Sequence, residues 1–192
     1  MKPLLLTLAL FAAAGCHHGN RCAPGGASTV EVRNGSGALV LALQGNTLCD
    51  AQWNRAGTID SSKKDAVTLL DAAGKLRLEV TRVDDGGANA RDSQGPHLRL
   101  YHDAHEWRVM RADGVPLGSV QPQTTNGAIV YDKSSSPMAK ISLRDRDAVV
   151  LDMAGTALTY VHPSSELGPA GVFAVPSLDP AEQLALYIYW SR

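Results

Sequence analysis

The feature that most constrains the fold is a hairpin pattern that occurs four times along the chain. Each copy has a short apolar run, a turn rich in Asp, Ala, Ser and Gly, and a second run that ends in Val or Ile. A Gly in such a turn supplies the positive φ of tight hairpins, and an Asp before it can bond its own backbone. We therefore expect two antiparallel strands from each copy. The copies are LLDAAGKLRLEV (69–80), VMRADGVPLGSV (109–120), VYDKSSSPMAKI (130–141) and VLDMAGTALTYV (150–161).

The second copy departs from this pattern. Its aspartate, Asp113, directly precedes Gly114, whereas in the first and last copies an Asp stands three residues before the Gly. We allow for a different turn type there. A further hairpin is expected within QWNRAGTID (52–60), with its turn at Ala56 and Gly57.

Apolar and polar residues alternate on either side of these turns, as in KLRLEV (75–80) and HLRLYH (97–102). Strands with one buried face alternate in this way. Short strands at this spacing, about twelve in all, predict a mainly β fold. The fold class is an antiparallel barrel or sandwich of hairpins rather than a βαβ arrangement.

The chain ends in a stretch, LDPAEQLALYIYWSR (178–192), that is largely apolar. Asp179 is a good helix N-cap, Pro180 suits the first helical position, and Glu182 completes a capping box. A helix over about 180–190 is too short to span a bilayer, which needs about 20 residues. A helix that is apolar on all sides is otherwise buried in protein, so we expect it inside an antiparallel β-barrel. The alternative is a final edge strand, because the last apolar residues also alternate.

The first sixteen residues, MKPLLLTLALFAAAGC, combine one positive charge, an apolar run and small residues before Cys16. This layout is typical of a secretory signal, and small residues followed by a cysteine resemble the bacterial lipobox. We predict a cleaved lipoprotein signal peptide (1–15), a lipidated Cys16 that begins a flexible tether (16–28), and a single barrel domain (29–192). The alternative is an ordinary signal peptide whose cleavage site adjoins a cysteine.

This N-terminus also predicts where the protein is and what it contacts. Several acyl chains on Cys16 would hold it on a bilayer, and His17 in place of an aspartate predicts, by resemblance to enterobacterial sorting, the outer membrane of a bacterial cell envelope. The formal charge of −1 offers no basic field for nucleic acid. The expected partners are the membrane, through the lipid, and an envelope protein, glycan or lipid.

The two cysteines that remain, Cys22 and Cys49, are candidates for a disulfide, because the envelope beyond the inner membrane is oxidising. A bridge over this separation would stabilise the fold by about 3 to 4 kcal/mol on the chain-entropy model. It would also tie the tether to the domain. The alternative is two free thiols, since spacing alone gives no distance between them.

Repeated hairpins with D-x-x-G-like turns, followed by the acidic-capped apolar segment LDPAEQLALYIYW (178–190), resemble the tubby-like superfamily. That group comprises the tubby C-terminal domain, the phospholipid scramblases and the LURP-one-related proteins. The resemblance covers about residues 29–192 and implies a closed barrel of about twelve strands around a central helix. It transfers no binding residue, because the tubby phosphoinositide site needs clustered basic side chains and Lys63 and Lys64 form the only adjacent basic pair in this sequence.

Two segments contain residues that could bind metal ions. In YHDAHEW (101–107), His102, His105 and Glu106 are zinc-type ligands, but strand geometry would place the two histidines on opposite faces, so a polar turn is favoured. An earlier segment, DDGGANARDSQGP (84–96), contains four residues with oxygen ligands. These are Asp84, Asp85, Asn89 and Asp92.

The spacing of these four residues does not fit known calcium loops. We expect residues 84–96 to form a surface loop and, as the longest stretch without a strand pattern, to be the first choice for a contact surface. Neither segment predicts a metal site, and we expect no cofactor.

No catalytic motif stands out. Ser134, Ser135 and Ser136 occupy the turn of a hairpin, and no G-x-S-x-G elbow precedes a helix. We expect a lipid-anchored envelope protein with a non-catalytic binding or structural role. The alternatives are an envelope hydrolase whose site forms only in three dimensions, with His102 or His162 beside a serine and a carboxylate, and a metal-binding envelope protein.

Overall fold

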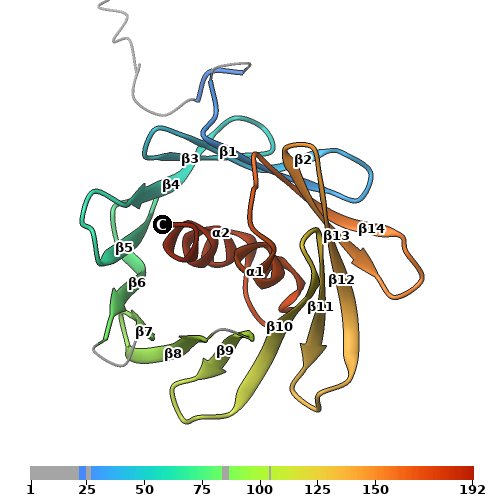
Figure 1. Ribbon diagram of the computed structural model, residues 1–192. Coiled ribbons are helices and arrows are strands. Elements are labelled where there is room, and N and C mark those ends of the chain that lie inside the picture. Colours follow the sequence, from blue (N-terminus) through green and yellow to red (C-terminus); the bar gives the residue numbers. More distant parts are fainter. Residues whose placement is uncertain (1–21, 25–26, 84–86, 104) are drawn as a thin grey trace, which may run out of the picture.

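The computed structural model describes residues 22–24, 27–83, 87–103 and 105–192. The predicted signal peptide (1–15) and Cys16 lie outside this part of the chain. Within it, fourteen antiparallel strands follow one another around a closed barrel, each paired with the next, and the last strand pairs back onto the first (Figure 1). The predicted mainly β, antiparallel barrel is confirmed, with fourteen strands in place of about twelve.

The strands are β1 (Val30–Asn34), β2 (Leu39–Gln44), β3 (Thr47–Asp50), β4 (Arg55–Asp60), β5 (Ala66–Asp71), β6 (Leu76–Arg82), β7 (Ala88–Asp92), β8 (Gly95–His102), β9 (Trp107–Arg111), β10 (Pro116–Thr124), β11 (Gly127–Asp132), β12 (Pro137–Arg144), β13 (Asp147–Asp152) and β14 (Ala157–His162). The register of the closing pair places Val32 of β1 opposite Val161 of β14, and both side chains are buried. All four predicted hairpins are confirmed, as β5–β6, β9–β10, β11–β12 and β13–β14.

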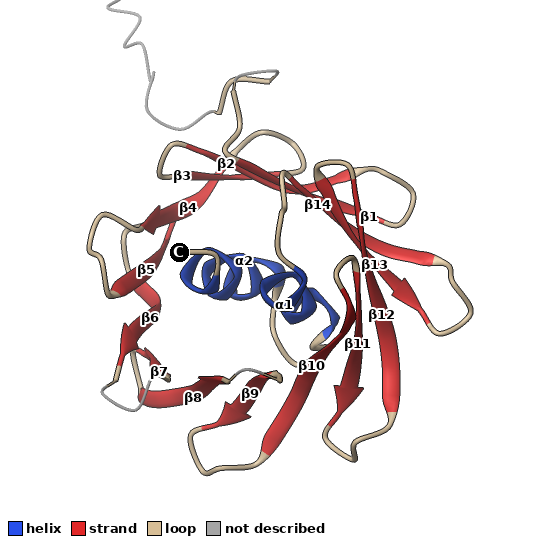
Figure 2. Ribbon diagram, viewed as in Figure 1, coloured by secondary structure: helices blue, strands red, loops and turns tan. Residues whose placement is uncertain are grey.

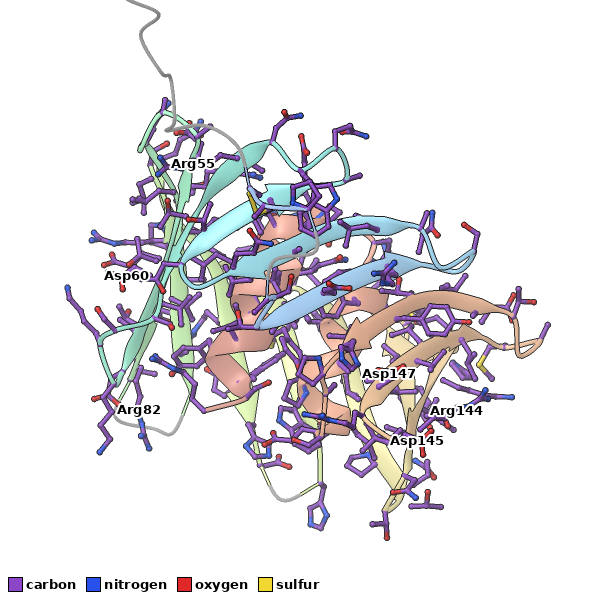
Figure 3. All side chains as sticks on the ribbon, turned by 90° about the horizontal axis from the view of Figure 1, so that it is seen from above. Arg55, Asp60, Arg82, Arg144, Asp145 and Asp147 are labelled. Carbon is purple, nitrogen blue, oxygen red and sulfur yellow. A yellow bond between two sulfur atoms is a disulfide. The ribbon has the colours of Figure 1, made fainter. Side chains whose placement is uncertain are left out.

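Because the strands alternate in direction, the turns that follow odd-numbered strands share one end of the barrel, which we call the turn end. The connections that follow even-numbered strands share the other, the loop end. Figure 3 labels Arg55 where β4 begins at the turn end and Asp60 where it finishes at the loop end. Arg144 and Asp147 mark the β12–β13 connection, which also belongs to the loop end.

Six of the turns at the turn end have the same backbone structure. In each, the first residue donates its N–H to the carbonyl four residues on, at 2.8–2.9 Å, and its carbonyl accepts from the N–H three residues on, at 2.8–3.1 Å. The residue three positions after the first has a positive φ. The first residues are Asn34, Asp50, Asp71, Arg111, Asp132 and Asp152.

Side-chain carboxylates or amides reinforce these turns. In the five that begin with Asp or Asn, a side-chain oxygen accepts the N–H four residues on. These bonds favour the charged carboxylate, so the backbone N–H of Thr156 holds the pKa of Asp152 below its usual value of 3.8. In the turn that begins at Arg111, Asp113 accepts the same N–H, from Val115 at 3.2 Å. The allowance for a different turn type at this hairpin is therefore wrong.

The barrel is filled by the C-terminal part of the chain (Figure 2). It forms α1 (Leu167–Ala170), the 3-10 helix η1 (Gly171–Ala174) and α2 (Pro180–Trp190). The predicted capping box is present, since Asp179 accepts from the N–H groups of Ala181 and Glu182, and Glu182 accepts from the N–H of Asp179. The predicted C-terminal helix inside the barrel is confirmed, and the alternative of an edge strand is excluded.

The middle of α2 is fully enclosed, with Leu184, Ala185 and Leu186 each 0% exposed. It packs mainly on β5 and β6, where inward-facing side chains such as Leu69 and Leu78 are also 0% exposed. Each large apolar side chain buried here contributes about 1.5 to 3 kcal/mol. None of the helices in the described residues is long and apolar enough to cross a membrane.

No pattern in the sequence predicts α1 and η1, which fit against the wall because glycine backbone lies directly on it. A Cβ on Gly168 would lie 2.1–2.5 Å from ring atoms of Trp107, and one on Gly171 would lie 2.1 Å from a methyl group of Val120. No larger residue fits at either position without displacing these side chains. Glycine here allows close approach rather than a turn.

The surface loop predicted over residues 84–96 is wrong for most of the residues that the structure describes there, 87–96. Residues 88–92 form β7, and β8 begins at Gly95. Ala88 and Ala90 point inward and are 2% and 0% exposed, so the strand continues the wall with small side chains. The prediction failed because alanine is too weakly apolar to mark a buried strand face.

The predicted turn at Ala56 and Gly57 is also wrong, since both residues lie within β4. The chain turns earlier, at Asp50–Asn54. Gly57 serves a different purpose, because an added Cβ would lie 2.2 Å from the carbonyl oxygen of Leu70 on the neighbouring strand.

The predicted disulfide between Cys22 and Cys49 is present. With Ala42 it forms a small buried cluster, against which Leu39 and Trp53 pack. This cluster is separate from the main core, to which the neighbouring Leu48 of β3 belongs. Because side chains alternate along a strand, the disulfide joins the N-terminal segment to the outer face of β2 and β3.

The repeated turn predicts opposite effects of glycine and serine exchange at equivalent positions. Ser135 has φ 60° where Gly155 has φ 92°, and left-handed backbone costs about 1 to 2 kcal/mol for a residue with a side chain. Ser135→Gly should raise the free energy of unfolding by about 0.5 to 1 kcal/mol, after the entropy cost of glycine.

The matched change Gly155→Ser should lower the free energy of unfolding by a similar amount. An added Cβ on Gly155 meets no atom within 4 Å, so its effect comes from the backbone alone. Urea denaturation of both variants measures the two changes. Shifts of the same sign would contradict the shared turn geometry.

Candidate functional site

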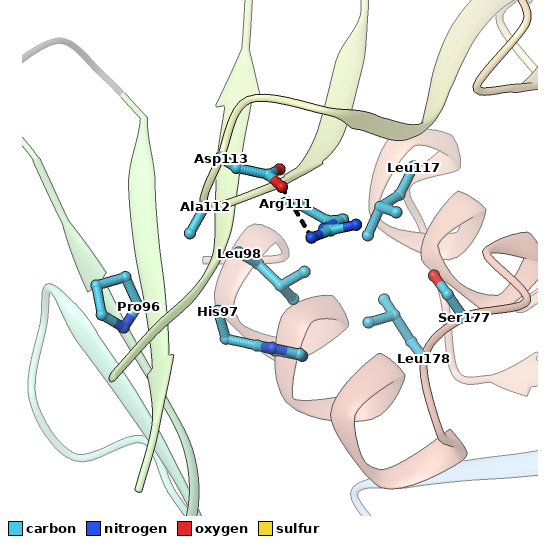
Figure 4. A pocket seen from close by; sticks show the side chains of 9 residues that line it. All are labelled: Pro96, His97, Leu98, Arg111, Ala112, Asp113, Leu117, Ser177 and Leu178. Atoms are coloured by element: carbon cyan, nitrogen blue, oxygen red, sulfur yellow. Dashed lines mark ion pairs between the residues drawn. The ribbon is translucent and has the colours of Figure 1, made fainter. Parts of the chain in front are cut away.

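A hollow of about 480 Å³ opens at the turn end of the barrel, between the wall and the segment that enters α2. Figure 4 shows its side chains, which come from β8, the β9–β10 turn, β10 and the segment between η1 and α2. We call it the turn-end hollow. It is lined by Pro96, His97, Leu98, Arg111, Ala112, Asp113, Leu117, Ser177 and Leu178.

The floor of the turn-end hollow is apolar. Leu98 points inward from β8 and is 1% exposed, and Leu178 is held at 6% exposure by the segment before α2. Leu117 completes the floor from β10 and packs against the main core. Such a floor favours an apolar group on a ligand, at about 25 cal/mol for each Å² of surface buried.

The rim carries ionisable side chains that lie in pairs. The guanidinium of Arg111 lies 2.8 Å from the carboxylate of Asp113, both within the β9–β10 turn. On the β8 side, Nδ1 of His97 lies 3.8 Å from the carboxylate of Asp92. The hydroxyl of Ser177 adds a neutral polar group. The rim thus offers both donors and acceptors to a ligand.

More charges surround the N-terminus of α2 beside the turn-end hollow. Arg77 of β6 forms an ion pair with Asp179. Burial raises the pKa of Glu182, and the charge of Asp179 raises it further, while His97 and Arg77 act in the opposite direction. Because positive and negative groups alternate, the site suits a ligand that is neutral or carries both signs better than one with a single strong charge.

A second depression adjoins the first on the outer face of the barrel. It has a volume of about 620 Å³ and shares Pro96, Leu98 and Ala112 with the turn-end hollow. Its other residues lie mainly on the outer faces of β6, β7 and β8, with Arg91 paired to Glu79 at 2.5 Å. We place the candidate site in the turn-end hollow, because its apolar floor belongs to the main core.

Two of the residues predicted to form a contact loop lie at these two hollows. Asn89 lines the outer depression, and Asp92 lies beside His97 at the rim of the turn-end hollow. The other two, Asp84 and Asp85, lie outside the described residues.

The candidate zinc-type ligands His102, His105 and Glu106 do not come together. His102 stacks on Trp107 with ring centroids 4.3 Å apart. Glu106 is 7% exposed on the outer wall, where it pairs with Arg108 and accepts a hydrogen bond from Gln121 at 3.1 Å. Over the described ranges, no group of three or more His, Cys, Asp and Glu side chains could hold a metal ion. His105 therefore belongs to no such group.

A histidine and a carboxylate do meet at the loop end. Nδ1 of His162 lies 2.5 Å from Oδ1 of Asp147, and both side chains are about half exposed. A serine is near in sequence, but the hydroxyl of Ser164 donates to the carbonyl of Glu166 at 3.4 Å rather than to His162. The nucleophile, base and acid of a hydrolase are therefore not assembled there.

Comparison with known proteins adds little to this description. No protein-family model matches the chain, and the search of curated proteins finds no match. A solved structure of a protein from Arabidopsis thaliana is similar to this chain, with 17% identity and a TM-score of 0.43 over 71% of this chain and 90% of that one. The architecture and the site described here rest on strand pairing and side-chain geometry alone.

Sequence reasoning missed most of the turn-end hollow. In the sequence, its charged residues belong to expected strands and turns, and Leu178 belongs to the segment that leads to a helix. The one available signal was Arg111, which stands where the other copies of the turn have Asp or Asn.

The raised pKa of Glu182 predicts how this region responds to pH. A carboxyl that keeps its proton to higher pH when folded than when unfolded stabilises the fold less as the pH rises above 4.5. The free energy of unfolding of Glu182→Gln should therefore equal that of the wild type near pH 3 and exceed it near pH 7. The gain at pH 7 should be on the order of 0.5 kcal/mol, because the half-exposed group is screened by water.

Denaturant titrations at several pH values measure this difference. Glu166→Gln, at an exposed position at the loop end, is the control for the loss of one carboxylate elsewhere in the chain. If the difference in free energy of unfolding between Glu182→Gln and the wild type were the same at every pH, the raised pKa of Glu182 would be contradicted.

Proposed function

We propose that this protein is a lipid-anchored, non-catalytic binding protein of the bacterial cell envelope, held at the outer membrane by acylated Cys16. We propose further that it binds its ligand in the turn-end hollow. The observation that carries this is the hollow itself, where an apolar floor meets a rim of paired ionisable side chains at the mouth of a barrel that is otherwise filled by its own chain. Concave sites with an apolar lining and a few polar groups are typical of ligand-binding sites.

The lipid anchor is supported by the sequence MKPLLLTLALFAAAGC. It also agrees with the position of α2, because the other strongly apolar segment is enclosed by the barrel and does not serve as an anchor. Acyl chains on one residue give stable membrane binding when two or three are present.

We also propose that the chain is related to the tubby-like superfamily. The support is the order of its parts, with consecutive antiparallel strands that enclose a C-terminal apolar helix. The relationship implies nothing about the ligand, because no basic cluster of the phosphoinositide-binding type is found in this sequence.

The anchor predicts a definite mass and solubility. Protein expressed with its own leader in a bacterial host should begin at residue 16 and carry a diacylglyceryl group, seen as added mass on the N-terminal peptide. It should partition into the detergent phase of Triton X-114. Cys16→Ala should abolish the added mass and the partitioning. An unmodified N-terminus at residue 16 in the wild type would contradict lipidation.

The binding site predicts position-specific cross-linking in cells. A photo-reactive residue at Ser177, in the turn-end hollow, should form a discrete adduct that mass spectrometry can identify. The same residue at Ser134, in another turn at the same end, should not. Arg111→Gln should lower the yield, whereas Arg144→Gln at the loop end should leave it unchanged.

Identical adducts at Ser177 and Ser134 would contradict a specific site. The non-catalytic role would be contradicted separately, by turnover of an envelope ester, amide or glycan substrate that one point substitution abolishes.

A further inference from the structure

We infer that the outer wall of the barrel carries a second binding site, which binds a neutral oligosaccharide of N-acetylated sugars. The site is a hollow of about 440 Å³ over β9, β10 and β11, three strands that lie side by side in Figure 1. We call it the wall hollow. It shares no lining residue with the turn-end hollow, so the inference does not depend on what binds there.

The wall hollow lies over the small side chain of Ser119. The strand register places Arg108 of β9 and Tyr131 of β11 directly opposite Ser119, one on each side of it. Each of the three residues is next in its strand to a valine of the main core, so the three side chains point outward. A short side chain between two long ones leaves a depression in the wall. Its volume falls within the range of about 300–1,000 Å³ that is typical of small-molecule sites.

A buried carboxylate lines the wall hollow. Glu106 is 7% exposed although it lies on the outer face, and it is the only buried residue with a charged side chain in the described part of the chain. Burial of a charge is costly unless the charge is paired. Here each carboxylate oxygen has a partner, since Arg108 forms an ion pair with Oε1 and Nε2 of Gln121 donates to Oε2 at 3.1 Å. Glu106 therefore positions two other side chains.

This pairing determines which polar groups a ligand meets. A carboxylate only accepts hydrogen bonds, so Gln121 turns its NH₂ group toward Glu106 and its carbonyl oxygen away from it. The side chain of Arg108 is 56% exposed and has further N–H donors besides those that face Glu106. The wall hollow thus offers an oriented acceptor on Gln121 beside oriented donors on Arg108.

Apolar surface lies next to these polar groups. Met110 of β9 and Pro116 of β10 are opposite each other in the register, and both line the wall hollow. The ring of Tyr131 adds an aromatic face that C–H groups of a sugar can cover. An acetamido group has one N–H, one carbonyl and one methyl group, which match an acceptor, a donor and an apolar contact that lie together. The hydroxyls of the sugar both donate and accept, and so suit the polar mouth.

Other classes of ligand fit the wall hollow less well. Its charged side chains, Glu106, Arg108, Asp132 and Lys133, sum to zero, so a strongly charged ligand gains no net attraction. An extended peptide is bound along a free sheet edge, whereas β9, β10 and β11 each have a paired strand on both sides. A peptide across these side chains would leave most of its backbone groups unpaired. An N-acetylated sugar has a single amide to satisfy.

The wall offers room for more than one sugar. A second hollow of about 470 Å³ adjoins the wall hollow toward the loop end and shares Glu106, Arg108 and Gln121 with it. We therefore expect an oligosaccharide to bind more tightly than a single sugar.

Titration of the purified protein with two hexasaccharides tests this inference. Fully N-acetylated chitohexaose and cellohexaose have the same linkage, and differ only in that each sugar of the first has an acetamido group in place of a hydroxyl. Isothermal titration calorimetry should show chitohexaose bound at least about tenfold more tightly, because the oriented hydrogen bonds to the amide are lost in cellohexaose. Equal affinities, or no binding of chitohexaose at about 1 mM, would overturn the inference.

Substitutions in β10 locate the bound sugar. Gln121→Leu removes the amide and should weaken chitohexaose binding about tenfold, and Ser119→Phe fills the wall hollow and should abolish binding. Gln123→Leu, two residues further along β10 and outside the wall hollow, is the matched control and should have no effect. Circular dichroism verifies that each variant is folded. Wild-type affinity in a folded Gln121→Leu variant would overturn the inference.

A double-mutant cycle tests the positioning role of Glu106. Glu106→Gln should weaken chitohexaose binding, and its effect should be largely absent when Gln121→Leu is already present, because Glu106 acts through Gln121. Glu31→Gln is the matched control, since Glu31 also pairs with an arginine two residues along its strand, at 2.7 Å, and should leave binding unchanged. Fully additive losses would contradict the positioning role.

The same titration separates this site from the turn-end hollow. Arg111→Gln alters the turn-end hollow and should leave chitohexaose binding unchanged. If Arg111→Gln abolished binding and Gln121→Leu did not, the sugar would belong to the turn-end hollow and the wall hollow would be excluded. Ser134, the control position of the cross-linking experiment, does not line the wall hollow, so each site can fail without the other.

Discussion

The whole architecture depends on filling the lumen of the barrel. A ring of fourteen strands encloses more space than its own inward side chains can occupy, since about eight strands already give an interior that side chains just fill. The C-terminal segment supplies the missing volume, and Leu184, Ala185 and Leu186 have no exposed surface. Where α1 meets the wall, Gly168 and Gly171 bring backbone against Trp107 and Val120.

Much of this fold could be predicted from the sequence because the signals are local. Five of the six repeated turns begin with Asp or Asn, and a residue with positive φ stands three positions later. The helix start has Asp179, Pro180 and Glu182, which also act on neighbours within four residues. The errors came where a residue's role depends on a distant segment. The sequence predicts a turn at Gly57, but this residue is a glycine because the carbonyl of Leu70 lies against it.

The candidate site could not be predicted for the same reason. His97, Arg111 and Leu178 lie far apart in the sequence and meet only when the segment before α2 reaches the turn end. None of them has a neighbour that would mark it as functional. At the loop end, the fold brings His162 and Asp147 together as a pair suited to catalysis, but the nearby Ser164 is not hydrogen-bonded to His162.

The filling segment follows all fourteen strands in the sequence, and this order has a consequence for folding. The strands precede α2 in the sequence, so they have no helix to close around until residues 180–190 are available. A chain synthesised from its N-terminus would stay open until most of it has been made. Closure of β14 onto β1 would then be a late event, coupled to the arrival of the final helix rather than to the pairing of neighbouring strands.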